Sequence, residues 1–369
     1  MSEAALMEAK SRLGSTVLVP SVKELAKEQF ISIPPRYVHH DQQPPSTVID
    51  TNSLPQIPVI DMAKLLSQEF MDSELQKFHH ACRDWGFFQL VNHGVSTELL
   101  EKVKVETEKF FNLPMEKKEK LWQKAGEIEG FGQHFVNSEE QKLEWADLFY
   151  VVTLPPRSRK PHLFDNFPPS FRDTIEAYSE ELQGVANKIF KLVIKALGIM
   201  EVDYIRELFE EGWQAMRMNY YPSCPQPDLV IGLKPHSDAT GLTILFQLND
   251  IVGLQIKKDG LWIPVKPIPN AFIINIGDML EIVTNGIYRS IEHRATISSN
   301  KERLSIATFH NPKFDAELVA ASSLVTPQTP QAFKRMSVSD YFKGYLSREL
   351  DGKSFIEFLR IQNDQIKNN

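Results

Sequence analysis

The 369-residue chain has few of the features that mark secreted, membrane-spanning or nucleic-acid-binding proteins. It contains only two cysteines, Cys82 and Cys224, which are too few for a disulfide scaffold or for a zinc site built on thiolates. It has no run of about 18 apolar residues, and its first residues lack the apolar segment of a signal peptide. We therefore expect a cytoplasmic protein with reduced thiols and no contact with a membrane.

The charge and composition of the chain exclude further classes of protein. The net charge is −7 at pH 7 and no block of basic residues stands out, so a nucleic-acid partner is not expected. Glycine and proline are not in excess, and hydrophobic residues make up 42% of the chain. These values are typical of a folded globular protein and exclude wholesale disorder.

The hydrophobic pattern changes character near residue 213. Before this point apolar residues recur at helical spacing, and the longest such stripe runs from Phe171 to Leu197 and ends at Gly198, a residue suited to a helix C-terminus. After it, short apolar runs are broken by turn residues at roughly every ten positions, as in a β-sandwich or barrel. Shorter elements are expected as a capped helix after Ser21, a helix over 72–85, strands over 57–61 and 86–94, and a helical tail over 337–361.

From this change of pattern we predict five consecutive regions. They are an N-terminal extension (1–55), a region of helices and strands (56–165), a supporting long helix (166–210), an all-β core (211–315) and a helical C-terminal tail (316–369). A helix with one apolar stripe of that length should lie along a large apolar surface, such as the outside of a sheet.

Three residues of the β half have the chemistry of metal ligands. His236 and Asp238 are two positions apart, so on a strand their side chains would point to the same face. His293, in a later predicted strand, could be the third ligand if the β-sandwich brings that strand close to His236 and Asp238. Two imidazoles and one carboxylate with open coordination positions are typical of non-haem Fe(II) oxygenases, whereas structural zinc has four ligands. A His-x-Asp motif alone is common by chance and would more often be a surface turn, and His293 alone a core histidine.

A second pair of residues follows ten positions after His293. Arg303 and Ser305 would share one face of the next strand, with a guanidinium that can bind a carboxylate at two points and a hydroxyl beside it. Near an iron site, such a pair suggests a dicarboxylate that bridges the metal and the arginine, and 2-oxoglutarate fits. Taken alone, Arg303 would more often be a surface residue of the charged run KER.

The order of these motifs carries a resemblance to a known family. The motifs are NYYPSCP (219–225), His236-Ser-Asp238, YRSIEHR (288–294) and Arg303-Leu-Ser305. In this order and spacing the chain resembles the plant 2-oxoglutarate-dependent dioxygenase family, and IPVID (57–61) and WGFFQLVNHGV (85–95) match its N-terminal region. GFGQHF, LEWADLFY and QAMRMNYY are most similar to the alkaloid O-demethylase and senescence-related branches of that family.

The resemblance implies a fold and a set of ligands. The fold is of mixed α and β class, with a double-stranded β-helix (distorted jelly roll) core packed against N-terminal helices and followed by the helical tail. His236, Asp238 and His293 would bind Fe(II) and form the catalytic centre. The residues implied for 2-oxoglutarate are Arg303, Ser305, Tyr221 and Asn219. O2 and ascorbate, as reductant, complete the cofactors, and we expect a monomer whose partner is a small molecule.

The resemblance also suggests where the substrate binds. By comparison with flavonoid-oxidising members, Leu148, Tyr150, Arg217, Phe309 and Asn311 should line the substrate pocket. Leu148 stands in place of a tyrosine, Arg217 of a lysine and Asn311 of an acidic residue, which weakens the case for a flavonoid. These changes suggest a bulky, partly aromatic substrate held mainly by apolar contacts. Phe149 and Trp145 of the same segment could be plain core.

The reaction implied is hydroxylation or O-demethylation with release of succinate and CO2. Two other classes stay open. One is a relative of the same fold that acts without 2-oxoglutarate, as an ascorbate-dependent oxidase or a norcoclaurine-synthase-like condensing enzyme. The other is a non-catalytic protein that binds a metabolite. The intact pair Arg303 and Ser305 weighs against the first, and the three intact metal ligands weigh against the second.

Overall fold

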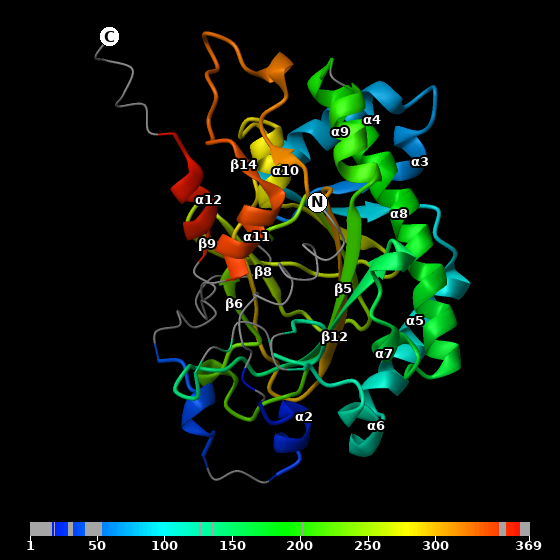
Figure 1. Cartoon of the computed structure of the whole chain (residues 1–369), viewed down its shortest axis with the longest axis vertical. Helices are drawn as coiled ribbons and strands as arrows, with labels where there is room; N and C mark the ends of the chain where they lie inside the picture. The colour runs from blue at the N-terminus through cyan, green and yellow to red at the C-terminus, as the bar shows by residue number, and fades with distance from the viewer. Residues whose placement is uncertain are drawn as a thin grey trace.

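The computed structural model describes most of the chain as two β-sheets with helices on the outside (Figure 1). The described residues are 17, 19–28, 32–40, 54–124, 127–133, 136, 138–200, 202–346 and 352–361. Most of the predicted extension (1–55) and the end of the GFGQHF motif lie outside them. Within this part of the chain the larger sheet has eight strands and the smaller has four.

The larger sheet combines strands from both halves of the chain, in the order β1-β2-β10-β7-β12-β5-β4-β3. Its strands are β1 (Val59–Asp61), β2 (Phe87–Val91), β3 (Gly130–Gly132), β4 (Asp147–Leu154), β5 (Trp213–Tyr221), β7 (Leu242–Gln247), β10 (Phe272–Ile276) and β12 (Arg303–Asn311). The sequence pattern did not predict β4, because its interior is buried on both faces and shows no alternation. Since β4 pairs with β5, the regions 56–165 and 211–315 share one sheet.

The smaller sheet has the order β6-β11-β8-β9 and packs against the larger one. Its strands are β6 (Leu233–His236), β8 (Leu254–Lys258), β9 (Leu261–Pro264) and β11 (His293–Ala295). An apolar cluster that includes Phe87 and Ile273 of the larger sheet and Ile256 and Ile263 of the smaller one joins the two. The expected double-layered β core is confirmed. A separate two-stranded sheet is formed by β13 (Glu317–Leu318) and β14 (Met336–Ser337).

The helices are unevenly distributed around this core. They are α2 (Val22–Leu25), α3 (Met62–Leu65), α4 (Met71–His80), α5 (Thr97–Phe111), α6 (Met115–Glu119), α7 (Pro161–Phe164), α8 (Pro169–Leu197), α9 (Val202–Glu210), α10 (Asp278–Val283), α11 (Val338–Leu346) and α12 (Ser354–Leu359). Single turns occur at η1 (Pro35–Tyr37), η2 (Ala81–Trp85), η3 (Pro156–Ser158), η4 (Pro227–Leu229) and η5 (Ser322–Leu324). Figure 1 shows α5 and α8 beside the larger sheet, with α11 and α12 on the other side of the core.

The long helix α8 confirms the prediction from its apolar stripe. It ends at Gly198, whose φ of 62° is the left-handed conformation that a glycine C-cap adopts without strain. Its buried face packs on α5 and on strands β4, β7 and β12, and Phe110 of α5 stacks on Phe171 with ring centroids 4.0 Å apart. The helix therefore supports the larger sheet from outside.

Other predicted elements appear with changed lengths. Ser21 caps α2 by accepting from the Glu24 amide, although that helix has only four residues. The helix expected over 72–85 is α4 continued by the π-helical turn η2. The expected tail over 337–361 consists of α11 and α12, and residues 347–351 between them lie outside the described part.

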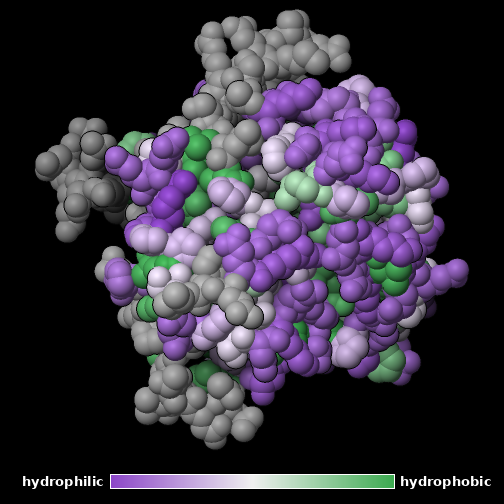
Figure 2. Space-filling view, turned by 90° about the horizontal axis from the view of Figure 1, so that it is seen from below, coloured by the Kyte–Doolittle hydropathy of each residue, from purple (hydrophilic) through white to green (hydrophobic). Residues whose placement is uncertain are grey.

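The outer surface shows little continuous apolar area on the side seen in Figure 2. Hydrophilic side chains predominate on that face, and the hydrophobic ones form small groups between them. Among the described residues, no helix combines the length and apolar character that crossing a bilayer requires.

Candidate active site

Strand pairing in the smaller sheet places two histidines beside each other. His293 at the start of β11 lies directly opposite His236 at the end of β6 in the antiparallel ladder. Their ring centroids are 4.2 Å apart. Residues far apart in the chain thus meet because their strands are neighbours in the sheet.

Asp238 joins them in a different way from the one expected. We expected His236 and Asp238 on one strand, but β6 ends at His236 and Asp238 lies in the following loop. The ladder stops there because the Ser237 amide donates to the Gly352 carbonyl and the Asp238 carbonyl accepts from the Asp278 amide. The conclusion about proximity holds nevertheless, since one ligand atom from each of His236, Asp238 and His293 lies within 4.8 Å of the others.

Backbone hydrogen bonds orient the two imidazoles. Nδ1 of His236 is 2.8 Å from the Lys234 carbonyl, and Nδ1 of His293 is 3.0 Å from the Ile291 carbonyl. A carbonyl only accepts, so each Nδ1 is the donor, and the neutral form of each imidazole has its lone pair on Nε2. The Nε2 atoms lie 3.4 and 3.7 Å from Oδ1 of Asp238. The three donor atoms therefore converge with the lone pairs that a metal ion requires.

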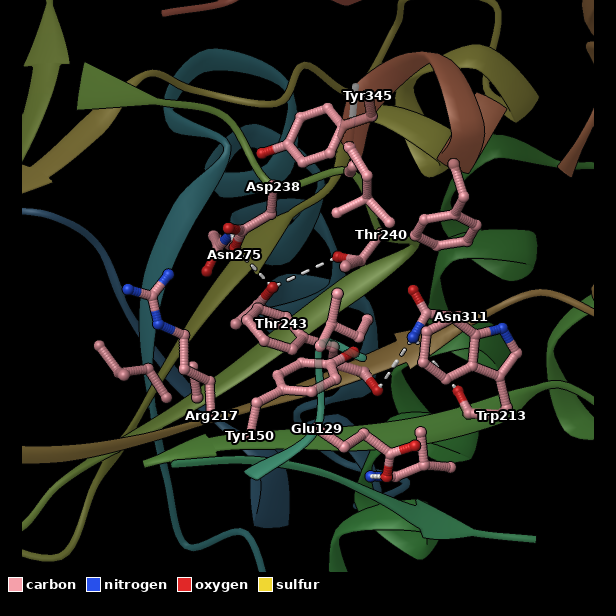
Figure 3. Close-up of a pocket in the computed structure, with 18 of the residues that line it drawn as sticks. Glu129, Tyr150, Trp213, Arg217, Asp238, Thr240, Thr243, Asn275, Asn311 and Tyr345 are labelled. Atoms are coloured by element: carbon pink, nitrogen blue, oxygen red, sulfur yellow. Dashed lines mark hydrogen bonds between the residues drawn. The ribbon is translucent and has the colours of Figure 1, made fainter. Parts of the chain in front are cut away.

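The second oxygen of Asp238 is held by two buried neighbours. Oδ2 accepts from the Thr243 hydroxyl at 2.6 Å and from the side-chain Nδ2 of Asn275 at 2.7 Å (Figure 3). Burial alone would raise the pKa of Asp238, but His293, His236 and Thr243 together hold that pKa below its ordinary range. Burial and the neighbouring His236 lower the pKa of His293 to about 4. At neutral pH these are a carboxylate and a neutral imidazole, the protonation states in which both bind metals.

This donor set fits Fe(II). Two imidazole nitrogens and one carboxylate oxygen occupy one side of a site and leave the cavity side open, which suits a metal that must also bind a cosubstrate. No cysteine belongs to the group. Among the residues that the structure describes, this is the only cluster of three or more possible metal ligands. A closed structural zinc site would need a fourth protein ligand.

Strands β5 and β12 carry most of the other predicted residues, which face one another across these two paired strands along the cavity wall. Directly opposite pairs are Arg303 with Tyr221, Ser305 with Asn219, Ala307 with Arg217, Phe309 with Ala215, and Asn311 with Trp213. Except for Ala215, all of these residues line one cavity. The residues expected to bind 2-oxoglutarate thus lie at one end of the ladder, and Phe309 and Asn311 lie at the other.

The 2-oxoglutarate end contains buried polar atoms without partners. The Ser305 hydroxyl and the Asn219 side-chain oxygen make no hydrogen bond within the described chain. Arg303 is only 3% exposed, and its Nε and Nη2 donate to the Gln247 side-chain oxygen at 3.2 and 3.0 Å. No carboxylate pairs with Arg303 among the described residues, although its guanidinium lies 5.1 Å from the centre of the Tyr221 ring. Such groups are costly to bury unless a ligand satisfies them.

The cavity extends well beyond this end and has a volume of about 870 Å³. Tyr150, Arg217, Phe309 and Asn311 line it, as expected for a substrate pocket. Leu148 does not reach the cavity and packs in an apolar cluster with Tyr150 and Phe309. Leu148 is therefore a core residue, and so are Phe149 and Trp145, for which this alternative was considered. The substrate roles of the other four residues stay predictions.

Sequence reasoning missed several residues of the site. Asn275 and Gln247 are polar positions within the buried runs FIINI and LTILFQ, and this unusual placement was an available signal. Phe342, Tyr345 and Leu346 of α11 also line the cavity. The tail was expected to be helical, but nothing in its pattern indicated that it closes one side of the site.

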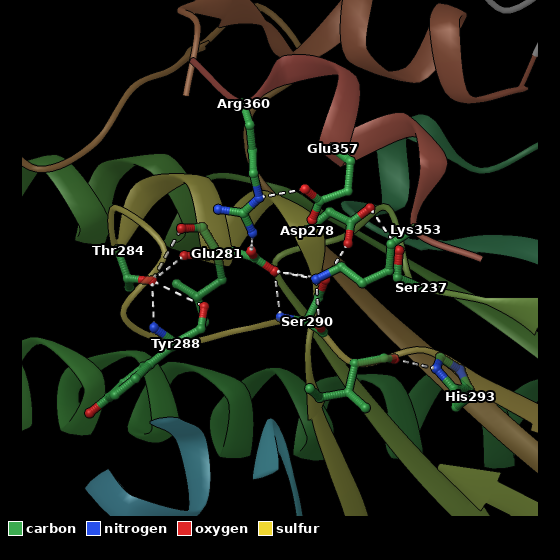
Figure 4. A network of polar contacts seen from close by, with 12 residues as sticks. Ser237, Asp278, Glu281, Thr284, Tyr288, Ser290, His293, Lys353, Glu357 and Arg360 are labelled. Atoms are coloured by element: carbon green, nitrogen blue, oxygen red, sulfur yellow. Dashed lines mark hydrogen bonds and ion pairs between the residues drawn. The ribbon is translucent and has the colours of Figure 1, made fainter. Parts of the chain in front are cut away.

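A buried ionic cluster fastens the tail to the core (Figure 4). Glu281 of α10 is fully buried and accepts from the Lys353 ammonium at 2.8 Å, from the Ser290 amide at 2.8 Å, and from Arg360. Lys353 also donates to the Ser290 carbonyl at 2.6 Å. Because Lys353 and Arg360 flank α12, this one carboxylate holds both ends of that helix.

Replacing Lys353 with methionine is expected to lower the free energy of unfolding by about 2 kcal/mol, because a buried carboxylate loses one of its two cations. Lys257→Met is the matched control, since Lys257 pairs with Glu292 at 3.0 Å while 41% exposed. We expect Lys257→Met to lower the free energy of unfolding by less than about 1 kcal/mol. Urea unfolding curves measure both changes, and equal losses would contradict the structural importance of the cluster.

Two family descriptions match the chain. That of the 2OG-Fe(II) oxygenase superfamily matches residues 212–312, and that of the N-terminal region of non-haem dioxygenases in morphine synthesis matches residues 57–170. The first range contains the three converging ligand residues and the ladder of β5 and β12.

Similar proteins align over nearly their whole length. Protein SRG1 of Arabidopsis thaliana is 56% identical over 96% of this chain and 100% of its own. The oxoglutarate-dependent flavonoid 7-O-demethylase 1 of Ocimum basilicum is 52% identical (98% and 96%), and codeine O-demethylase of Papaver somniferum is 50% identical (95% and 98%).

Among solved structures, JOX2 in complex with 2OG, Fe and JA superposes with a TM-score of 0.85 at 34% identity, covering 95% of this chain and all of that one. The likeness extends over both sheets and the helices around them, so the jelly-roll expectation is confirmed. This chain therefore belongs to the 2OG-Fe(II) oxygenase superfamily and is an oxidoreductase of its dioxygenase class.

Proposed function

We propose that the chain catalyses the Fe(II)- and 2-oxoglutarate-dependent O-demethylation or hydroxylation of a bulky, partly aromatic specialised metabolite. In this proposal His236, Asp238 and His293 hold the iron, and Arg303, Ser305, Tyr221 and Asn219 hold 2-oxoglutarate. The observation that carries it is Arg303, a buried guanidinium that has no carboxylate partner in the described chain and lies on the cavity wall shared with the three converging ligands.

The proposed cosubstrate complements the polar end of the cavity. 2-Oxoglutarate has a carboxylate at each end, so a guanidinium can bind one end while the keto acid end reaches the metal. Gln247 holds Nε and Nη2 of Arg303 and thereby orients the plane of the guanidinium. The Ser305 hydroxyl is available to donate to the same carboxylate.

The remaining cavity suits a substrate of considerable size. A volume of about 870 Å³ exceeds what 2-oxoglutarate needs, and drug-sized ligands occupy pockets of this class. Tyr150, Trp213, Phe309 and Phe342 supply an aromatic lining, and Arg217 and Asn311 supply polar groups. Two similar proteins are named as O-demethylases, one for a flavonoid and one for codeine, so both compound classes are candidates.

The chemistry proposed for the bound iron and 2-oxoglutarate is activation of O2 for oxidation of a C–H bond. For a methyl ether, the balanced reaction consumes the ether, O2 and 2-oxoglutarate and yields the free hydroxyl compound, formaldehyde, succinate and CO2. The protein's own residues position the C–H bond near the ligand cluster and exclude bulk water, since His236, Asp238 and His293 are all buried. No side chain is required to act as a general acid or base.

Succinate formation with defined compounds tests the proposal. Purified protein is supplied with Fe(II), ascorbate, 2-oxoglutarate and single members of a panel of O-methylated flavonoids, alkaloids and phenylpropanoids. At least one member should stimulate succinate, and an equal amount of formaldehyde would identify O-demethylation. The demethylated form of the same compound is the control and should give no formaldehyde.

Two outcomes separate the alternatives. Stimulated succinate without formaldehyde would indicate hydroxylation. Conversion of a compound without any succinate would contradict the proposal and favour a relative of the fold that acts without 2-oxoglutarate.

We also propose that the enzyme works as a monomer in the cytoplasm. Cys82 and Cys224 are both free and buried, which is consistent with a reducing compartment. Light scattering on the purified protein measures the mass directly.

A further inference from the structure

Ser237, the residue between two of the proposed ligands, has all of its polar atoms held. Its amide donates to the Gly352 carbonyl at 3.2 Å, and its hydroxyl donates to the Asp278 carboxylate at 3.1 Å. Its carbonyl accepts from the Tyr345 hydroxyl at 3.0 Å. The residue is 1% exposed. The peptide that joins His236 to Asp238 is therefore fixed from several directions.

Much of this support comes from the C-terminal part of the chain. Besides accepting from Ser237, Gly352 donates its amide to the Pro235 carbonyl at 3.0 Å. Tyr345 belongs to α11, and Figure 3 shows its hydroxyl directed toward the loop that bears Asp238. Because β6 ends at His236, this loop lacks the strand pairing that orients the two histidines.

The same helix also touches the substrate side of the cavity. Phe342, Tyr345 and Leu346 of α11 line it, and Tyr341 donates to the Asp278 carboxylate at 2.8 Å. Thus α11 forms part of the cavity wall and also contacts Ser237 and Asp278, which support the loop that bears Asp238.

We propose that Tyr345 is a positioning residue for the metal centre: by holding the Ser237 carbonyl, its hydroxyl sets the orientation of the peptide that carries His236 and Asp238. This inference rests on the proposed metal site. Without this hydrogen bond the Ser237–Asp238 peptide gains freedom to rotate. The alignment of the Asp238 carboxylate with the two imidazoles then depends only on the remaining hydrogen bonds of Asp238, with Thr243, Asn275 and Asp278. Groups that orient metal ligands in this way affect metal affinity although they do not touch the ion.

Tyr345→Phe removes only the hydroxyl and tests the proposal. The affinity of the full-length, metal-free protein for Mn(II) is measured by calorimetry without substrate, so the effect of α11 on substrate binding does not enter. We expect the dissociation constant to rise about tenfold. Hydrogen exchange in the peptide around residues 233–241 should also become faster.

Tyr204→Phe is the matched control. The Tyr204 hydroxyl also donates to a backbone carbonyl, that of Val319, at 3.0 Å, and Tyr204 is no part of the cavity lining. Loss of the Tyr204 hydroxyl should leave the affinity for Mn(II) and the rate of hydrogen exchange around residues 233–241 unchanged. Equal weakening of Mn(II) binding in both variants would indicate general destabilisation and overturn the assignment.

Two further results distinguish this inference from the proposed function. If wild-type protein binds Mn(II) and Tyr345→Phe binds it equally well, the positioning role is wrong while the metal site stands. If the wild-type protein binds no Mn(II) and no Fe(II), the proposed metal site itself is wrong, and the role assigned to Tyr345 falls with it.

Discussion

Replacing His236 with alanine is expected to abolish both metal binding and substrate-dependent succinate formation while the protein stays folded. The variant leaves one imidazole and one carboxylate, and divalent metal affinity falls steeply when one of three protein ligands is lost. Calorimetry with Mn(II) measures binding, and the succinate assay measures turnover. Circular dichroism and the unfolding temperature show whether the fold persists.

His93→Ala supplies a matched control. His93 and His236 are each 5% exposed, and a ring nitrogen of each lies 2.8 Å from a backbone carbonyl. Both variants therefore lose a buried imidazole and a comparable hydrogen bond, but His93 is not one of the residues that line the cavity and stacks on Phe272. We expect His93→Ala to lose stability and keep metal binding. Wild-type activity in His236→Ala would rule out the metal assignment.

Replacing Arg303 with alanine is expected to raise the 2-oxoglutarate concentration needed for half-maximal activity by about 100-fold. The change removes charge-assisted hydrogen bonds to the distal carboxylate, which contribute about 1.5–3 kcal/mol each. The affinity for Mn(II) should stay within about twofold of the wild-type value, because Arg303 is proposed to bind only the far end of the cosubstrate.

Arg303→Lys provides an intermediate step. It keeps the positive charge but loses the planar fork that binds a carboxylate at two points, so we expect a smaller rise in the 2-oxoglutarate requirement than for alanine. Titration of 2-oxoglutarate at saturating Fe(II) gives the three values. An unchanged requirement in Arg303→Ala would mean that another residue holds the distal carboxylate.

Much of the fold could be predicted where local patterns carry the information. The stripe of α8, its glycine cap and the sequence of short strands after residue 213 all appear in the structure. The strand β4 could not be predicted in this way, because burial on both faces removes the alternation that marks a half-exposed strand. Asp238 does lie near His236 as expected, but the reason given for it was wrong. The two residues do not share a strand face, and Asp238 is brought close by a loop that hydrogen bonds to Gly352 and Asp278 hold in place.

The sequence by itself determined which chemical groups are available: His236, Asp238, His293 and Arg303, with spacings that restrict the kind of site they can form. It also determined the longest helix and most strands of the β half, because their apolar patterns can be read from residues a few positions apart. Only the tertiary structure decided that His293 faces His236, that Leu148 stays out of the cavity, and that Tyr345 reaches the carbonyl of Ser237, 108 residues away. Contacts over such separations arise from how sheets and helices pack. The residues that make these contacts show no periodic pattern in the sequence that would predict them.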